Sequence, residues 1–352
     1  MTKRLVPLGT RARQRATSIQ VGPVADLDVL VVLYGRSLPR AAAVARTFAK
    51  WNALYRPMPR VLCAWCYRDG EAPGDLAALP AYPWLVRIPL PEYDLDDAIF
   101  RKEGLLNLLI REHSTAPCIL TLDADVWCED PLWFARVRAL LASDPACVLQ
   151  PFRTMSDIEE VRWVPSWSSQ VLPGVRRDIA EQPGLGWGFT RTWVQRHGDR
   201  PVFNPWLVTG SGDCMFVLEH FPDSRADYFR ERHARYAYFR HIFRPGQPTG
   251  NLNCVDAAVW HENHTDRSKV PEHAKGKWLA DRAYVWSRQW LDQVGPLDRH
   301  LYLDARGVPM PRDPEGPFVR VCRRKPELQS DGMIRRVLAE EFGISPNQPQ
   351  EN

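Results

Sequence analysis

Continuous apolar runs, rather than alternating ones, mark the first third of the chain. They cover residues 28–34, 61–66 and 84–88. Such runs are typical of strands buried on both faces of a sheet. Between the first two, Ser37 and Pro39 precede a segment that reaches residue 54, and a capping serine followed by proline favours a helix start there. Strands alternating with helices predict an α/β fold with a mostly parallel, Rossmann-like sheet and helices on both faces.

The next segments continue this alternation. Residues 94–113 carry apolar side chains at helical spacing and predict an amphipathic helix. The apolar run 119–122 predicts a strand that ends at Asp123 and Asp125, and residues 132–141 predict the following helix. The two acids therefore belong to a strand-to-helix junction, the place where open α/β sheets bind ligands.

Regular patterns weaken after this junction. Residues 145–205 are rich in Trp, Pro and Gly and predict long loops that cover a ligand. Shorter patterns then predict a helix over 215–220, a strand over 255–260 and a helix over 333–342. The proline-rich stretch 309–317 and the tail from 346 are predicted to be extended or disordered. We expect a flexible basic arm at 1–25, one main domain at 26–305 and a C-terminal extension at 306–352.

Composition limits the class of protein. The chain has 352 residues, 45% hydrophobic and 25% charged, with a formal net charge of +4. These values are typical of globular proteins, and the small positive charge permits an anionic ligand without requiring nucleic acid. Since no run of 18 apolar residues and no leader-like N-terminus occurs, we predict a cytoplasmic protein without a membrane span.

The eight cysteines lie in apolar segments, which favours reduced thiols. Cys63 and Cys66 have C-x-x-C spacing, but no second pair follows, so zinc or redox chemistry is not predicted.

Asp123 and Asp125 form a candidate metal site. Side chains two apart on a strand point the same way, so both carboxylates face one hard cation. The alternative is that Asp123 caps a turn and Asp125 is solvated.

A second candidate is Asp213, which follows two glycines in Gly210-Ser-Gly-Asp. Glycine permits close backbone approach to a ligand, and an acid beside an apolar segment has a raised pKa suited to a general base. The alternative is an N-cap of the helix that follows.

Two histidines near the end of the last predicted strand are candidate ligands as well. His261 or His264 would complete the site of the two acids, and an imidazole added to carboxylates suits Mn²⁺ or Mg²⁺ better than zinc. Either histidine alone is also common at a surface. The basic residues that follow could neutralise a diphosphate or form a solvated loop; they are Arg267, Lys269, Lys275, Lys277 and Arg282.

Two aromatic segments have open interpretations. Gly186 and Trp187 belong to a Gly-Trp-Gly run that is weak as a phosphate loop, and its indole would either stack on a sugar or anchor the core. Residues 225–244 interleave arginines with aromatics. This pattern is found where bases stack, but a helix with outward arginines is the favoured interpretation.

In this order, the motifs resemble those of metal-dependent GT-A glycosyltransferases, in particular bacteriophage-type members. The first strand ends in Val32-Leu-Tyr-Gly-Arg36, a basic helix contains Phe100-Arg-Lys-Glu-Gly-Leu-Leu-Asn107, and the Asp-x-Asp motif, the Gly-rich Asp213 segment and a late histidine follow. Arg282-Ala-Tyr284 completes a histidine, basic loop and Arg-x-Tyr arrangement. The resemblance covers residues 26–305.

The resemblance implies a hexosyl- or pentosyltransferase that moves a sugar from a nucleoside diphosphate to a hydroxyl. Transfer would be inverting, with Asp213 as base and Mn²⁺ or Mg²⁺ held by Asp123, Asp125 and His264 or His261. The candidate donor contacts are Tyr34, Arg36, Asp69, Lys102, Asn107, Gly186, Trp187, Arg267 and Arg282.

The acceptor and the class of function have alternatives. The basic arm and the phage-type resemblance suggest a hydroxymethylated base in DNA as acceptor, which would place the protein in a host cytoplasm, while polysaccharide and protein hydroxyls stay open. A metal-dependent nucleotidyltransferase or phosphohydrolase, and a non-catalytic nucleic-acid-binding protein, are the alternative functions.

Overall fold

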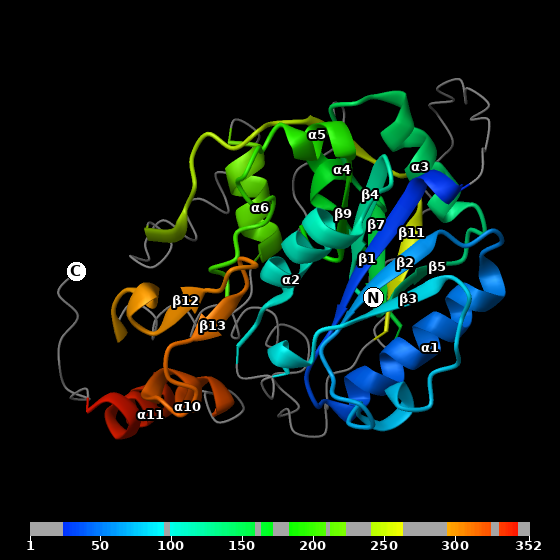
Figure 1. Cartoon of the computed structure of the whole chain (residues 1–352). Helices are drawn as coiled ribbons and strands as arrows, with labels where there is room; N and C mark the ends of the chain where they lie inside the picture. The colour runs from blue at the N-terminus through cyan, green and yellow to red at the C-terminus, as the bar shows by residue number, and fades with distance from the viewer. Residues whose placement is uncertain are drawn as a thin grey trace, which may run out of the picture.

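The structure is a computed structural model that describes residues 24–94, 99–158, 163–171, 183–208, 212–222, 241–262, 294–324 and 331–343. Its main sheet has seven strands in the order β10-β6-β9-β4-β1-β2-β3 (Figure 1). The strands are β1 (Leu27–Leu33), β2 (Arg60–Trp65), β3 (Leu85–Pro89), β4 (Cys118–Leu122), β6 (Cys147–Gln150), β9 (Gly186–Thr190) and β10 (Asn251–Cys254). All their pairings are parallel except the two made by β9.

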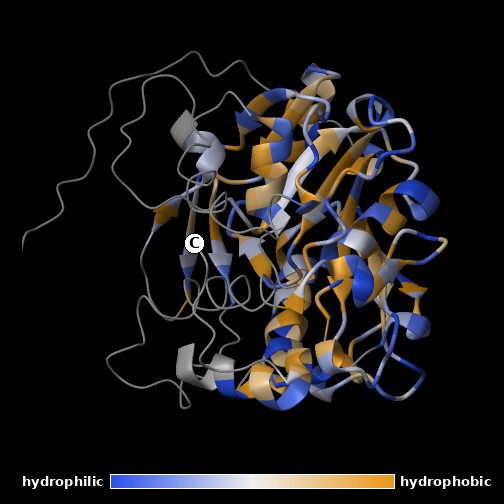
Figure 2. Ribbon diagram, turned by 90° about the vertical axis from the view of Figure 1, so that its left-hand side faces the viewer, coloured by the Kyte–Doolittle hydropathy of each residue, from blue (hydrophilic) through white to orange (hydrophobic). Residues whose placement is uncertain are grey.

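Helices cover both faces of this sheet. Alternate residues of β1 divide between two apolar clusters, because successive side chains of a strand point to opposite faces. Val29 and Val31 pack with α1 (Leu38–Leu54) and α3 (Trp133–Ser143), whereas Leu30 and Val32 pack with α2 (Lys102–Leu108) and α6 (Gly212–His220). Figure 2 shows the apolar residues gathered on the strands and on the inner sides of these helices. The predicted fold class is confirmed.

Local signals placed several elements correctly. Helix α1 begins where Ser37 caps it, with the side chain accepting a hydrogen bond from the backbone N–H of Arg40. The helices predicted near residues 132–141, 215–220 and 333–342 correspond to α3, α6 and α11 (Asp331–Phe342).

The helix predicted from residue 94 begins later. Residues Pro91–Tyr93 form a 3₁₀ turn and α2 starts at Lys102, continuing as a π-helical turn over Leu109–His113. The backbone N–H of Phe100 bonds to Val208 O at 3.0 Å, and the guanidinium of Arg101 bonds to Pro309 O. Phe100 and Arg101 are therefore held by other parts of the chain, and these tertiary contacts outweigh the helical period just before Lys102.

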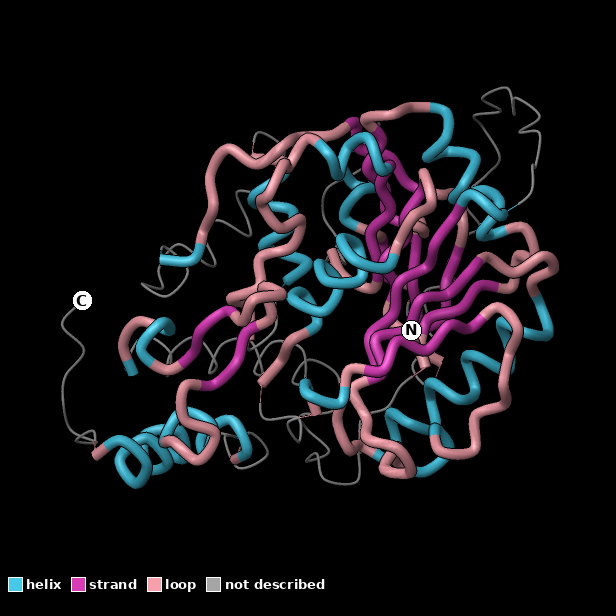
Figure 3. Tube along the Cα trace, viewed as in Figure 1, coloured by secondary structure: helices cyan, strands magenta, loops and turns pink. Residues whose placement is uncertain are grey.

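The prediction of loops over 145–205 was wrong for two strands of the main sheet. Strands β6 and β9 are fully buried, and β9 lies antiparallel between β4 and β6. Figure 3 shows the strands of the sheet side by side in magenta. Glycine is required at Gly186, because a Cβ there would lie 2.6 Å from Thr121 O. The Gly-Trp-Gly run is thus a close-packed strand rather than a loop.

A smaller sheet adjoins the end of β4. Its strands are β5 (Val126–Cys128), β11 (Ala258–His261), β7 (Thr154–Asp157) and β8 (Val164–Pro165), in that order. Strand β11 begins three residues later than predicted, because the loop before it bonds to its neighbours: Val255 N donates to Gln150 O, and Ala257 O accepts from Arg153 N. This sheet brings three chain segments far apart in sequence to one place.

The C-terminal part packs against α2. Strands β12 (Leu301–Leu303) and β13 (Pro309–Pro311) form a hairpin, followed by α10 (Pro317–Arg323) and α11. The stretch expected to be extended is therefore partly a strand and then a helix start. Shorter elements are η1 (Val24–Asp26), η2 (Gly74–Leu76), α4 (Trp167–Val171), α5 (Arg191–Gln195) and η7 (Leu297–Arg299).

Two further predictions concern a membrane span and the limits of the main domain. Among the described segments, none of the helices has the length and apolarity needed to cross a bilayer. The basic arm lies outside the described residues up to residue 23, and the division at residue 305, which falls in the turn between β12 and β13, stays a prediction.

Candidate active site

The two acids of the Asp-x-Asp motif occupy the turn between β4 and β5. The N–H of Asp123 bonds to Leu185 O at 2.9 Å, and the N–H of Val126 bonds to Asp123 O at 3.3 Å. The side chain of Asp125 is 5% exposed and that of Asp123 is 28% exposed. Asp125 is therefore not a solvated carboxylate, and the two acids have different surroundings.

Asp125 faces His261 across the small sheet. The Nε2 atom of His261 lies 3.5 Å from Asp125 Oδ1, while its Nδ1 atom lies 2.7 Å from Asp157 Oδ1. Burial alone would lower the pKa of His261, but the two carboxylates raise it to about 10. A proton on each ring nitrogen gives the imidazolium one N–H facing each of these two carboxylates.

Asp123 faces Lys102, the first residue of α2. The Nζ atom of Lys102 lies 2.5 Å from Asp123 Oδ1 and 3.9 Å from Asp213 Oδ2. Burial would lower the pKa of Lys102, but the charges of the surrounding acids hold it above its usual value. One ammonium thus links the Asp-x-Asp motif to the candidate base.

Asp213 lies in the first turn of α6 and has the electrostatics of a base. Burial raises its pKa and the charge of Asp123 adds to this, while Lys102 opposes it, and the result is a pKa of about 6. A carboxyl with this pKa is ionised near neutral pH and still takes up a proton readily. A raised pKa is what the apolar segment after Asp213 led us to expect, while the role of Asp213 as a base stays a prediction.

Glu103, which the sequence did not single out, borders the same cluster. Its side chain fills the space beside Gly212, where an added Cβ would lie 1.7 Å from Glu103 Oε1. Burial raises the pKa of Glu103 to about 8, so its carboxyl is mainly protonated at neutral pH. The only hint in the sequence was its position next to Lys102.

A small hollow opens at the end of β1 beside these acids. Its lining consists of Leu33, Tyr34, Gly35, Ser37, Arg40, Ala41, Val44, Tyr67 and Leu76. The guanidinium of Arg40 lies over the Tyr34 ring, 5.2 Å from its centroid. Burial would lower the pKa of Arg40, but Tyr34, Asp125 and Asp123 raise it. The sequence alone did not single out Arg40, whose only signal was its place in the first turn of a helix after a strand.

The three residues predicted to contact the nucleoside, Tyr34, Arg36 and Asp69, lie in different surroundings. Tyr34 lines the hollow. The guanidinium of Arg36 forms ion pairs with Glu71 and Asp94, and Asp69 is exposed in the turn after β2. Tyr34 contacts Arg40, whose charge interacts with Asp125 and Asp123.

Three further residues predicted to contact the donor instead make contacts within the protein. The amide of Asn107 bonds to both the N–H and the carbonyl of Phe203, at 2.9 and 2.8 Å. The ring of Trp187 is fully buried and donates to Pro183 O, and Gly186 is packed against Thr121. Trp187 is therefore a core anchor, the alternative considered for it, because β9 is an interior strand.

Several candidates lie outside the described residues. These are His264, Arg267, Lys269, Lys275, Lys277 and Arg282, together with residues 223–240 of the basic and aromatic segment. The thiols of Cys63 and Cys66 are buried, and burial raises the pKa of Cys66 to about 12, which is unlike a metal-binding or redox thiol.

Asp125 and His261 fit part of a divalent-cation site. In the described ranges no group of three or more His, Cys, Asp or Glu side chains is gathered as a metal site. Mg²⁺, however, is commonly held by one or two carboxylates together with substrate phosphates and water. The buried carboxylate of Asp125 and the adjacent imidazole of His261 supply that minimal set. Asp123 lies two residues before Asp125, and its carboxylate contacts Lys102.

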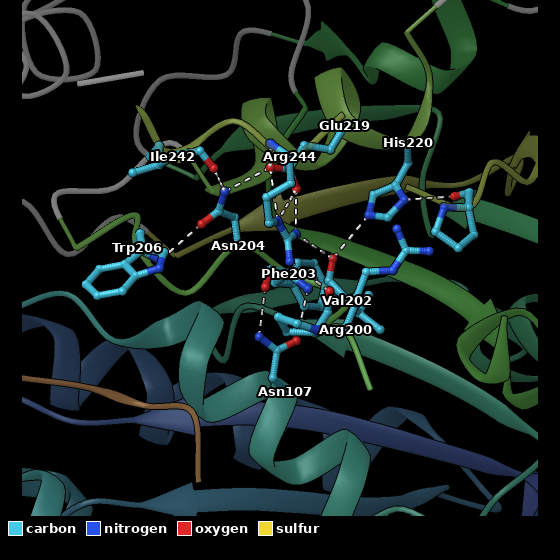
Figure 4. A network of polar contacts seen from close by, with 12 residues as sticks. Asn107, Arg200, Val202, Phe203, Asn204, Trp206, Glu219, His220, Ile242 and Arg244 are labelled. Carbon is cyan, nitrogen blue, oxygen red and sulfur yellow. Dashed lines mark hydrogen bonds and ion pairs between the residues drawn. The ribbon is translucent and has the colours of Figure 1, made fainter. Parts of the chain in front are cut away.

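A network at the other end of α6 anchors the helix that carries Asp213 (Figure 4). The side chain of Glu219 is fully buried and accepts hydrogen bonds from Arg244 Nε at 3.1 Å and Asn204 Nδ2 at 2.8 Å. His220 contacts the carbonyls of Pro248 and Val202. These contacts tie α6 to two segments that flank it in sequence.

Neither a protein-family model nor a curated protein sequence matches the chain. Solved structures similar to it include Staphylococcus aureus TarS 1–349, with 11% identity, 67% of this chain and 60% of that chain covered, and a TM-score of 0.40. Mannosyltransferase PcManGT from Pyrobaculum calidifontis, solved with GDP-Man and Mn²⁺, has 14% identity, coverages of 91% and 76%, and a TM-score of 0.37.

Galactosyltransferase LgtC, solved with donor and acceptor sugar analogs, has 13% identity, coverages of 73% and 94%, and a TM-score of 0.34. The chain spans three fifths of the TarS structure. Likenesses at this level carry no activity across to this chain.

Proposed function

We propose that the protein is a metal-dependent GT-A glycosyltransferase that moves a sugar from a nucleoside diphosphate to a hydroxyl. The observation that carries the proposal is the position of Lys102 Nζ, 2.5 Å from Asp123 and 3.9 Å from Asp213. It joins an acidic motif suited to a metal-bound diphosphate to a carboxylate suited to proton removal. The motif order described from the sequence supports the same assignment.

Asp125 and His261 would hold Mn²⁺ or Mg²⁺, with Asp123 beside them. When bound, the ion would stabilise negative charge on the departing nucleoside diphosphate. Lys102 and Arg40 add fixed positive charge on the same side, and Tyr34 lines the hollow next to the diphosphate end. This arrangement favours a leaving group with two phosphates.

Asp213 would act as the general base. Its carboxylate takes the proton of the acceptor hydroxyl as the acceptor oxygen bonds to the anomeric carbon, and the bond from that carbon to the diphosphate breaks. A direct displacement of this kind inverts the anomeric configuration. The neighbouring carboxyl of Glu103 is mainly protonated, so it does not add a second negative charge beside Asp213.

The acceptor we propose is a hydroxymethylated base in DNA, which rests on the phage-type motif order and the basic arm. Transfer to hydroxymethylated duplex would be compared with transfer to unmodified duplex and to polysaccharide. Label that appears in polysaccharide alone would contradict the DNA acceptor. Binding through phosphates should also weaken as salt is added.

The test of the proposed function uses a panel of nucleoside diphosphate sugars with Mn²⁺. We expect one donor to be consumed with release of nucleoside diphosphate, and Asp125→Asn to lower that turnover by roughly 10²-fold or more, as expected when a metal ligand is lost. Asp298→Asn is the matched control, because Asp298 is exposed on η7. Release of pyrophosphate, or full turnover by Asp125→Asn, would refute the assignment.

A further inference from the structure

Asp157 is the third side chain in a row that starts at Asp125 and passes through His261. Strands β7 and β11 are parallel neighbours, and Asp157 and His261 are register partners in that pairing. The ring places Nδ1 2.7 Å from Asp157 Oδ1 and Nε2 3.5 Å from Asp125 Oδ1. Each nitrogen therefore faces a different carboxylate.

The backbone around this row is fixed on both sides. The N–H of Ile158 donates to His261 O at 3.2 Å, and the N–H of Glu262 donates to Asp125 O at 2.8 Å. Sheet pairing thus sets where the imidazole sits. What the pairing leaves open is which ring nitrogen carries the hydrogen and which offers a lone pair.

A carboxylate that accepts a hydrogen bond from Nδ1–H determines which ring nitrogen of the histidine carries the hydrogen. When a divalent cation takes the place of the proton on Nε2, the hydrogen stays on Nδ1 and the lone pair of Nε2 is directed toward the cation beside Asp125. Histidines that ligate metals commonly have such a carboxylate or carbonyl behind them, and its loss typically weakens metal binding by about 10- to 100-fold.

We propose that Asp157 is a positioning residue that holds His261 with Nε2 directed toward the divalent cation shared with Asp125. The inference rests on the proposed function, because it needs the metal site at Asp125 and His261. It goes beyond that function by giving a role to a residue that acts through the His261 ring.

Asp256 supplies a control for charge alone. It lies in the loop before β11, its side chain is 79% exposed, and it pairs with Arg153 at 3.1 Å. Asp256→Asn removes the same negative charge from the same part of the molecule without touching His261.

The experiment measures Mn²⁺ affinity of the full chain from the electron paramagnetic resonance signal of free Mn²⁺, without donor or turnover. We expect Asp157→Ala to weaken binding by about 10- to 100-fold. Asp157→Asn retains an acceptor oxygen and should weaken it less, and Asp256→Asn should match the wild type. The double variant Asp157→Ala with His261→Ala should bind no more weakly than His261→Ala alone, because Asp157 acts through the ring.

Each other outcome overturns the inference in a distinguishable way. Full affinity in Asp157→Ala together with reduced affinity in His261→Ala removes the role of Asp157 and leaves the metal site standing. Additive losses in the double variant mean that Asp157 acts independently of His261. Unchanged affinity in His261→Ala removes both the ligand assignment and the inference. Thermal unfolding of the metal-free variants checks folding, and Asp157→Asn serves where Asp157→Ala does not fold.

Discussion

Asp213 sets the pH dependence expected of this protein. Its pKa is raised to about 6, chiefly by burial. A base works only when deprotonated, so kcat/KM should reach its plateau about one pH unit above this pKa, stand at half the plateau near pH 6 and fall further below it, rather than falling near the usual pKa of an aspartate. Asp213→Asn should lower the rate by roughly 10²- to 10⁴-fold and remove this limb. A pH–rate profile of both proteins checks the expectation.

Donor binding provides the control for that substitution. The donor would contact the metal and the residues around the hollow, so the thermal shift produced by donor plus Mn²⁺ should persist in Asp213→Asn. A wild-type limb near pH 4, or normal transfer by the variant, would mean that another group removes the proton.

Single residues were predictable where local sequence showed their surroundings. Asp123 and Asp125 follow an apolar strand and Asp213 follows glycines, so the sequence context was enough to select them. The expectation that both acids of the motif face one cation rested on strand geometry, but β4 ends at Leu122 and the turn after it directs Asp123 to Lys102 and Asp125 to His261. The contact of Lys102 with Asp123, and that of Asp157 with His261, depends on how distant strands and helices are arranged. Arg40 was missed for the same reason, since its charge matters only because α1 starts beside the acids.

At the scale of elements, the close contact between α2 and β13 gives a prediction with a definite sign. A Cβ added to Gly104 would lie 2.8 Å from Pro309 Cδ and 3.2 Å from Val308 Cα. Helix propensity alone would make Gly104→Ala more stable by about 1 kcal/mol. We expect overpacking to prevail and the free energy of unfolding to fall by about 1 to 3 kcal/mol.

Urea denaturation of Gly104→Ala measures this difference. Since Pro309→Ala removes the Cδ atom that the new methyl would meet, the combined variant should recover part of the loss. A gain in stability for Gly104→Ala would show that the hairpin moves aside at little cost.

Secondary-structure elements could be predicted where the hydrophobic pattern was long, and the prediction was wrong where the pattern was short. Strand β1 and helix α1 had unbroken apolar and helical patterns. Strand β9 has five residues with two glycines, which resemble a loop until the facing backbone of Thr121 is known. The predicted start of α2 was wrong because the side chain of Arg101 donates to Tyr93 O and Pro309 O, and a helical period in the sequence does not encode such contacts.

At the scale of the whole molecule, the Glu219 network holds α6 to segments on either side of it. Arg244 is the cation for a fully buried carboxylate and also donates to Pro201 O at 3.0 Å. Arg244→Met leaves that charge buried and unpaired, so we expect a loss of about 3 to 5 kcal/mol in the free energy of unfolding. Chemical denaturation measures it.

Two further variants separate burial of charge from simple loss of an ion pair. Adding Glu219→Gln to Arg244→Met should restore part of the stability, because the unpaired charge is removed. Arg153→Met breaks the exposed pair with Asp256 and should cost less than about 1 kcal/mol. Equal losses for Arg244→Met and Arg153→Met would show that the buried network does not stabilise the fold.

The ammonium of Lys102 against Asp123 has a practical consequence for handling the protein. Because the chain supplies its own counter-ion there, and His261 does so at Asp125, neither acid depends on an added salt to offset repulsion between them. Chelators such as EDTA should therefore leave the melting temperature of the metal-free protein unchanged, and should lower that of the metal-loaded protein only by the stabilisation that the bound ion had added. Reagents that acetylate amines should lower it once they reach this lysine.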